Sequence, residues 1–257
     1  LIVDSRTKQA KEKYEGSLFM SNKGGYVKVL CWNNSLDIDI VFIDTGYRTK
    51  VRKGNLQQGT MKDRSLPTLY GIGVVGEIVE NPNPQREYAY RIWTKMLERC
   101  YCEATQHKNP TYIGCQVSDC FKNFQHFYSW CSNQTGFYVE GFALDKDILV
   151  KGNKVYSEDT CCFVPKEINN LLLTSKRNRG NCVLGVYKIN KSEKYRAEVR
   201  RNGRGCSLGC FNTEIEAFQA YKQAKEAHIK EIANKWKDQI DNRVYKVLIS
   251  HEVHIDD

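Results

Sequence analysis

The periodicity of the apolar residues changes along the chain, and this change constrains the fold more than any other sequence feature. Residues 14–76 alternate apolar and polar positions in short runs separated by Gly and Asn, which is typical of antiparallel strands. Residues 86–101 instead show helical spacing, and alternation returns over residues 183–211. We therefore predict an α+β fold with sheets toward both ends and helices between them.

Two helices are predicted in the central part. The apolar residues of 86–101 form one face, opposite a basic face. The aromatic run 121–131 predicts the second helix. The apolar face of the first helix consists of Ala89, Trp93, Met96 and Cys100.

We expect three domains. Residues 1–80 form a small β-rich unit, either an open sheet or a barrel. Prolines and asparagines between residues 80 and 85 predict the first boundary. A core with flanking helices follows at residues 86–175, and a sheet-and-helix domain with C-terminal helices occupies residues 181–257.

Positive charge is concentrated in one segment. The chain has 39 Lys and Arg against 30 Asp and Glu, a net charge of +9. Between residues 176 and 204, ten basic residues stand against two acidic ones, a local net charge of +8. Such a positive field is typical of a polyanion site, most often for nucleic acid, and the alternative is a solvated basic loop.

Cysteine usage and hydropathy indicate an intracellular protein. The 11 cysteines, an odd number scattered through the chain, favour free thiols over a secreted disulfide scaffold. No apolar run of about 18 residues occurs and the N-terminal residues turn charged early, so we expect neither a membrane span nor a secretory signal. Only Cys115 and Cys120 have the spacing of a zinc knuckle, so zinc is not expected.

The basic segment predicts a three-stranded antiparallel sheet packed on a helix. Asn202-Gly203 is a strong hairpin signal between two of the strands. Thr213 and Glu216 have the spacing of a capping box at the start of the helix. Alternation along the middle strand places Arg196 and Arg200 on the face that points away from the helix.

Residues 144–169 could build a metal site. A metal-dependent nuclease needs hard oxygen ligands and open positions for water and phosphate. If residues 144–148 and 161–164 pair as a hairpin, the helix that follows from Pro165 returns Asn169 toward Asp145. Both side chains would then face one small pocket. In the alternative, they pair across a turn without a ligand.

Three central motifs resemble the HNH nucleases, also called ββα-metal or His-Me finger nucleases, and especially their phage-borne, homing-endonuclease-like branch. One motif is AYRIWTKMLERCY, which resembles the helix before the nuclease core, and another is FQHFYSWC, which resembles its Trp-and-Phe helix. The third is LDKDILVKGNKVYSEDTCCFV, which is similar to the family's Leu-Asp-Arg/His-x-Asp, Gly-Asn and Tyr-Ser-x-Glu/Asp-Asn-Cys run. The resemblance implies that residues 86–175 are an HNH-like core that hydrolyses DNA phosphodiester bonds with Mg²⁺ or Mn²⁺.

The resemblance also implies roles for single residues. Asp145 matches the metal-ligand carboxylate, and Asn169 matches the second ligand. Lys146 stands where the general-base histidine is expected, and Thr160 stands where the asparagine that orients it is expected. Both differ from the motif. Lysine has an ordinary pKa of about 10.4 and is therefore a poorer base than histidine near neutral pH.

Two interpretations of that difference remain open. In the first, a bound metal activates the water, Lys146 stabilises charge on the phosphate, and Asp147 or Glu158 accepts the proton. In the second, catalysis has been lost and the scaffold serves a DNA-binding or regulatory protein.

The run GVYKINKSEKYRAEVRRNGRGCSLGCFNTEIEAFQAYKQA resembles the ethylene-response-factor, or apetala-type, DNA-binding domain. That family lays a three-stranded sheet in the DNA major groove. The resemblance makes Arg196, Arg200 and Arg204 candidates for base edges, and it makes Lys188, Lys194 and Arg201 candidates for phosphates. Arg177 and Arg179 extend the basic surface.

The hypotheses for function are a DNA endonuclease, a DNA-binding regulator and, third, a zinc-stabilised interaction module. The resemblance implies double-stranded DNA as the partner, no membrane, and a location in the cytoplasm of a phage-infected bacterial cell. The sequence does not determine the oligomeric state.

Overall fold

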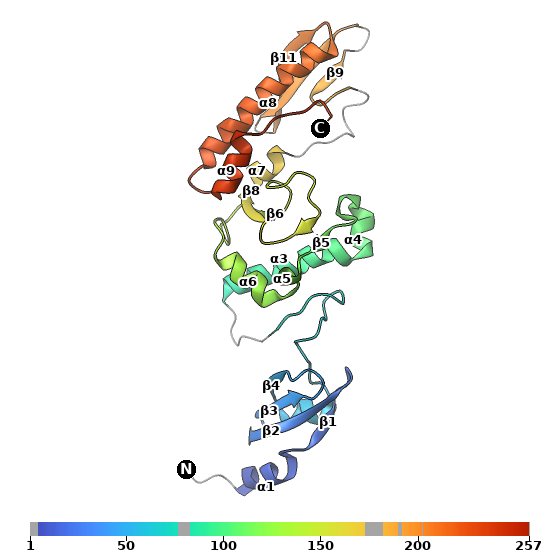
Figure 1. The fold of residues 1–257 in the computed structure, drawn as a ribbon, viewed down its shortest axis with the longest axis vertical. Helices are drawn as coiled ribbons and strands as arrows, with labels where there is room; N and C mark the ends of the chain where they lie inside the picture. Colours follow the sequence, from blue (N-terminus) through green and yellow to red (C-terminus); the bar gives the residue numbers. More distant parts are fainter. Residues whose placement is uncertain (1–4, 77–82, 173–181, 190–191, 202, 257) are drawn as a thin grey trace. The chain divides into compact units, whose positions relative to one another are not determined.

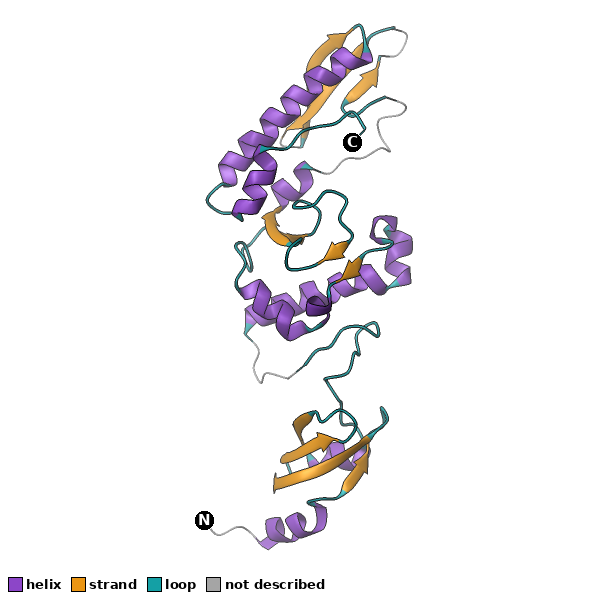
Figure 2. Ribbon diagram, in the orientation of Figure 1, coloured by secondary structure: helices purple, strands orange, loops and turns teal. Residues whose placement is uncertain are grey.

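The computed structural model describes residues 5–76, 83–172, 182–189, 192–201 and 203–256. The fold is mixed α+β, as predicted, with an N-terminal four-stranded antiparallel sheet, central helices and a C-terminal three-stranded antiparallel sheet packed on a helix (Figure 1, Figure 2). The chain divides into two compact units: Leu1–Pro82 with Lys122–Gln125, and Asn83–Phe121 with His126–Asp257. The second unit holds both the central helices and the C-terminal sheet, so the division into three domains stays a prediction.

The first unit contains an open sheet of order β1-β2-β3-β4. Its strands are β1 (Leu18–Met20), β2 (Tyr26–Asn34), β3 (Asp37–Phe42) and β4 (Arg48–Val51), preceded by helix α1 (Ser5–Tyr14) and followed by α2 (Lys53–Gln58). Alternate residues of β2 and β3 are buried, and Tyr14 of α1 stacks on Trp32 with ring centroids 4.6 Å apart. Among the described strands, β1 and β4 remain edges, so the sheet is not a closed barrel.

Helix α3 (Pro84–Tyr101) opens the second unit. It begins at a proline, and the side chain of Asn83 accepts a hydrogen bond of 2.8 Å from the backbone N–H of Arg86. The predicted apolar face is confirmed, because Ala89, Trp93, Met96 and Cys100 are all buried.

The aromatic helix predicted over residues 121–131 is instead two helices, α5 (Asp119–Lys122) and α6 (Phe124–Ser132). They are separated at Asn123, which forms an isolated bridge with Val74 of the same compact unit. A backbone that pairs with another segment cannot continue the helix, and the local sequence carries no sign of that distant partner.

Short elements fill the rest of the central part. They are α4 (Glu103–Lys108), the 3-10 helix η1 (Pro110–Tyr112), β5 (Gln116–Val117) and β7 (Val155–Tyr156), the last two pairing in parallel.

The predicted hairpin followed by a helix is present. Strands β6 (Phe142–Asp145) and β8 (Cys162–Pro165) pair antiparallel, with Asp145 opposite Cys162, and α7 (Lys166–Leu171) follows at once. Both strands differ from the predicted 144–148 and 161–164: the first begins earlier, at Phe142, and ends at Asp145, and the second is displaced by one residue.

The C-terminal sheet has the order β11-β10-β9, with β9 (Val186–Lys188), β10 (Tyr195–Arg201) and β11 (Arg204–Phe211). Helix α8 (Glu214–Trp236) packs on it, and α9 (Asn242–Ile249) follows (Figure 1). The predicted capping box is confirmed: the Thr213 side chain accepts from the Glu216 N–H at 3.2 Å, and the Glu216 carboxylate accepts from the Thr213 N–H at 3.1 Å.

Candidate functional site

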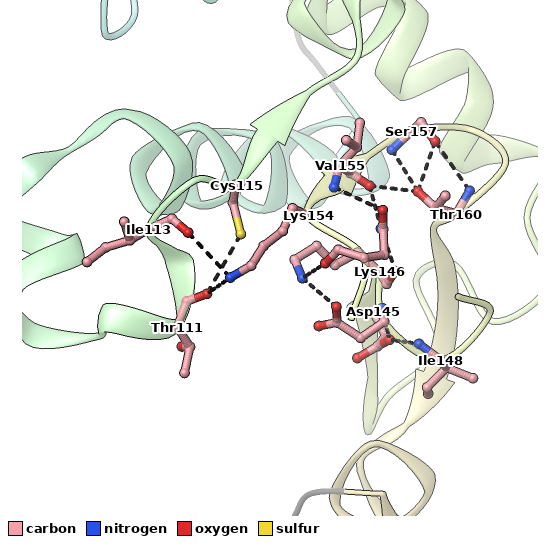
Figure 3. Close-up of polar contacts among 12 residues, drawn as sticks. Thr111, Ile113, Cys115, Asp145, Lys146, Ile148, Lys154, Val155, Ser157 and Thr160 are labelled. Carbon is pink, nitrogen blue, oxygen red and sulfur yellow. Dashed lines mark hydrogen bonds and ion pairs between the residues drawn. The ribbon is translucent and has the colours of Figure 1, made fainter. Parts of the chain in front are cut away.

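Strand β6 ends at Asp145 because the carboxylate of this residue holds the turn that follows. Its Oδ1 accepts hydrogen bonds from the backbone N–H of Asp147 at 2.7 Å and of Ile148 at 2.8 Å (Figure 3). Aspartate commonly directs the chain into a turn in this way. Within the described part of the chain, Oδ2 accepts no hydrogen bond, so one oxygen of a firmly held carboxylate remains available.

Burial raises the pKa of Asp145 above its ordinary value, because a buried carboxylate loses hydration. The N–H groups of Ile148 and Asp147 act in the opposite direction. The charge of Asp147 raises the pKa further, and the charge of Lys146 lowers it. The net pKa is raised because the loss of hydration outweighs these favourable contacts.

Asp145 and Asn169 line the same cavity, which has a volume of about 430 Å³. Asp147 also lines it from the turn, and Asn169 reaches it from α7. Lys151 adds a second charged side chain from the turn, and the remaining polar side chains come from the C-terminal helices and the residues after them: Tyr221, Lys225 and His251. The expected convergence of Asp145 and Asn169 on one pocket is therefore present, although their role as metal ligands stays a prediction.

The oxygen atoms of Asp145 and Asn169 are of the type that a hard divalent cation prefers, but they are few. No group of three His, Cys, Asp or Glu residues in the described ranges could hold a metal ion. Mg²⁺, however, is often bound through only one or two side-chain oxygens, with water and substrate phosphate completing its shell. The open oxygen of Asp145 and the amide oxygen of Asn169 are donors of that kind.

Lys146 is buried and donates two hydrogen bonds. The side chain is 7% exposed, and its ammonium donates to Asp147 Oδ1 at 2.6 Å and to the Asn153 carbonyl at 2.7 Å (Figure 3). It lies 5.7 Å from the centroid of the Tyr156 ring. An ammonium in this state has no lone pair with which to accept a proton.

Asn153 is a residue that the sequence marked only as part of a turn. Its side-chain amide donates to the carbonyls of Lys146 at 2.8 Å and Val155 at 2.7 Å, while its own carbonyl accepts from the Lys146 ammonium. Asn153 therefore holds both the backbone carbonyl and the side-chain ammonium of Lys146. This reciprocal pairing needs the three-dimensional turn, which the Gly152-Asn153 sequence signal does not specify.

The other predicted catalytic residues separate into different places. Thr160 donates to the Val155 carbonyl at 2.7 Å and lies 2.9 Å from Ser157 Oγ (Figure 3). Glu158 accepts from Ser118 at 3.2 Å. Burial raises the pKa of Glu158, but hydrogen bonds, including those with Cys120 and Ser118, outweigh it and the net pKa is lowered. Neither Thr160 nor Glu158 lines the cavity, so their catalytic roles remain predictions without support from its geometry.

The C-terminal sheet presents the predicted basic face. Arg196 and Arg200 are exposed while Ala197 and Val199 between them are buried against the helix, which confirms the predicted alternation. Arg196 lies 3.8 Å from Glu198 on the same face.

The remaining predicted DNA-binding residues do not all share that face. Lys188, Lys194 and Arg204 are exposed, but the register pairs Lys188 with Tyr195 and Arg204 with Arg201, so Lys188 and Arg204 do not share the face of Arg196 and Arg200. Arg201 alternates to the helix side, where its guanidinium lies 3.7 Å from Glu231 of α8. Arg177 and Arg179 lie outside the described residues.

Comparison of the chain with protein-family models, with curated proteins and with solved structures found no match. The likeness to HNH nucleases and to apetala-type domains therefore rests on the motifs alone. No helix within the described ranges has the length and apolar character needed to cross a membrane.

Proposed function

We propose that this chain is a DNA-binding endonuclease of the HNH type that hydrolyses phosphodiester bonds with Mg²⁺ or Mn²⁺. The observation that carries the proposal is the convergence of Asp145 and Asn169, from a hairpin and from the helix after it, on one cavity. The exposed Arg196 and Arg200 on the sheet of the same compact unit support DNA as the substrate.

The residues at the cavity divide the chemistry between them. A bound divalent cation supplies Lewis-acid activation of water and neutralises charge on the phosphate. Asp145 and Asn169 would hold that cation. Asp147 lines the cavity and pairs with Lys146 at 2.6 Å, so we assign Asp147 as the acceptor of the water's proton and Lys146 as the residue that positions it.

A second candidate is a DNA-binding regulator that keeps the scaffold without chemistry. The observation that favours it is Lys146, which stands at the position of the expected base and is buried as a donor. In either case we propose double-stranded DNA as the partner and the cytoplasm of a phage-infected bacterium as the location.

The test is cleavage of supercoiled and linear DNA with Mg²⁺, with Mn²⁺ and with EDTA, comparing the wild type with Asp145→Asn. The asparagine oxygen can still accept the two turn hydrogen bonds, so the variant changes charge with little change of shape. We expect metal-dependent nicking that falls by about a hundredfold or more in the variant, because a bound metal supplies several kcal/mol of transition-state stabilisation.

Glu140→Gln is the matched control, since Glu140 is an exposed carboxylate in the loop before β6, and its activity should equal that of the wild type. An absence of cutting by the wild type, together with salt-sensitive DNA binding, would support the regulator instead.

A further inference from the structure

Lys225 brings a positive charge from the C-terminal helix into the cavity of Asp145 and Asn169. It lies on α8, is partly buried and lines the cavity. Its ammonium donates to the backbone carbonyl of Leu171 at 2.7 Å, and Leu171 is two residues beyond Asn169 on α7. The lysine is therefore held near the end of the helix that carries the proposed second metal ligand.

This ammonium has no carboxylate partner among the residues that the structure describes. Burial lowers the pKa of Lys225, and no nearby charge acts against that effect. Other lysines of α8 differ: Lys222 lies 3.3 Å from Glu226, and Lys235 lies 2.7 Å from Glu167. A partly buried charge without a counterion is costly, and an anionic ligand in the cavity would compensate it.

Asp145 brings a group of opposite charge to the same cavity, and its Oδ2 accepts no hydrogen bond within the described ranges. Within the described ranges, the two groups form no ion pair, although they line one cavity. A ligand with a cationic centre at Asp145 and an anionic group at Lys225 would compensate both, and a phosphodiester associated with a divalent cation is such a ligand.

We propose that Lys225 is a phosphate-binding residue of this site, so that helix α8, which packs on the C-terminal sheet, completes the cavity formed by the hairpin and α7. The inference rests on the proposed function for its substrate, the DNA backbone, but phosphate binding itself does not require cleavage. Lys225 has two donors beyond the one that bonds Leu171, and they are available for phosphate oxygens.

The first test measures binding of inorganic phosphate by calorimetric titration, without metal, to the wild type and to Lys225→Met and Lys230→Met. Methionine keeps the length of the side chain and removes its charge. Lys230 is exposed on the same helix, so Lys230→Met is the matched control. We expect about tenfold to hundredfold weaker binding in Lys225→Met only, the size expected for one charged hydrogen bond.

Thermal unfolding of the same variants separates ligand binding from a structural role. If Lys225 serves only to tie α8 to α7, Lys225→Met will lower the melting temperature and leave phosphate binding unchanged, which would overturn the proposal. If it serves the ligand, phosphate will raise the melting temperature of the wild type and of Lys230→Met but not that of Lys225→Met.

A measurement on the wild type covers the case in which Lys225→Met does not fold. Acylation of lysines with acetic anhydride, followed by peptide mass analysis, should show Lys225 protected by phosphate while Lys230 reacts equally with and without it. Equal acylation of Lys225 in both conditions would contradict the proposal.

The outcomes also distinguish this inference from the proposed function. Phosphate binding that depends on Lys225, in a protein that cuts no DNA, would keep the inference and remove the nuclease. Metal-dependent cutting with phosphate binding unchanged in Lys225→Met would keep the nuclease and remove the inference.

Discussion

Lys146 stands where the resemblance to HNH nucleases places a general base, and its surroundings do not suit that role. Its ammonium bonds Asp147 and the Asn153 carbonyl, and its side chain is buried. As a donor in both bonds, it cannot act as a base in this arrangement. It can instead hold Asp147 at the cavity, and a positioning role of this kind has a consequence for stability.

We expect Lys146→Met to destabilise the protein by about 1–3 kcal/mol, because the Asn153 carbonyl and the Asp147 carboxylate lose their partner. Urea unfolding followed by circular dichroism measures the change. Lys166→Met is the control, since Lys166 is exposed at the start of α7 and should change the free energy of unfolding very little. Equal stability of the two variants would show that Lys146 does not support the turn.

At the scale of the element, Gly185 shows why the strands and α8 must pack closely. Its φ angle is +73°, and a Cβ atom there would lie 2.0 Å from the Tyr221 ring on α8. Tyr221 also lines the cavity. The chain just before β9 therefore lies against Tyr221, and a change at Gly185 would move a side chain that lines the cavity.

Gly185→Ala should destabilise the protein by more than about 1 kcal/mol, through backbone strain and displacement of Tyr221. Gly203→Ala is the matched control, because Gly203 has a similar φ of +75° but nothing within 4 Å of the added atom. Thermal unfolding of both variants separates the cost of the clash from the cost of the backbone angle. If Gly203→Ala lost as much stability as Gly185→Ala, the backbone angle alone would explain the loss, and the contact with Tyr221 would contribute nothing.

The two faces of the C-terminal sheet give a second prediction at this scale. We expect Arg196→Ala and Arg200→Ala to reduce discrimination between DNA sequences by about 1–3 kcal/mol, since guanidinium groups on the outer face can reach base edges. Lys188→Ala should weaken binding to all sequences alike and reduce the salt dependence by about one charge. Competition binding at several salt concentrations measures both effects.

Arg201→Ala is the control for that experiment, because Arg201 faces Glu231 on α8 rather than the outer surface. A loss of discrimination in Arg201→Ala equal to that in Arg200→Ala would contradict base reading by the outer face.

Elements whose determinants are local could be predicted from the sequence. The face of α3 and the capping box of α8 depend on residues within a few positions of one another, and both are present as expected. The break between α5 and α6 depends on Val74, which is far away in sequence, so it could not be predicted. Strand β6 ends at Asp145 because the carboxylate of this residue accepts hydrogen bonds from the backbone N–H groups of the next turn.

The candidate site was predictable to the same extent. Asp145 and Asn169 lie within one local hairpin and helix, and their convergence follows from that motif. Lys225 and His251 reach the cavity only through the packing of the C-terminal helices. No spacing rule connects them with Asp145.

At the scale of the second compact unit, the C-terminal helices are fastened to the hairpin region. Glu167 of α7 accepts hydrogen bonds from Lys235 at 2.7 Å and from Trp236 at 2.6 Å, and Arg243 donates to the Asp159 carbonyl at 3.3 Å. Helix α8, which packs on the basic sheet, thus also forms part of the cavity wall.

The most direct test of the central claim is binding of Mn²⁺ followed by electron paramagnetic resonance, because the proposed chemistry needs Asp145 and Asn169 to hold a cation together. We predict that Asp145→Asn and Asn169→Ala each bind Mn²⁺ at least about tenfold more weakly than the wild type, while Glu140→Gln binds equally. Affinity should fall as the pH is lowered through the raised pKa of Asp145, since the proton competes with the metal. Mn²⁺ binding that is absent in the wild type, or unchanged in Asp145→Asn, would contradict the assignment of this cavity as a metal-dependent nuclease site.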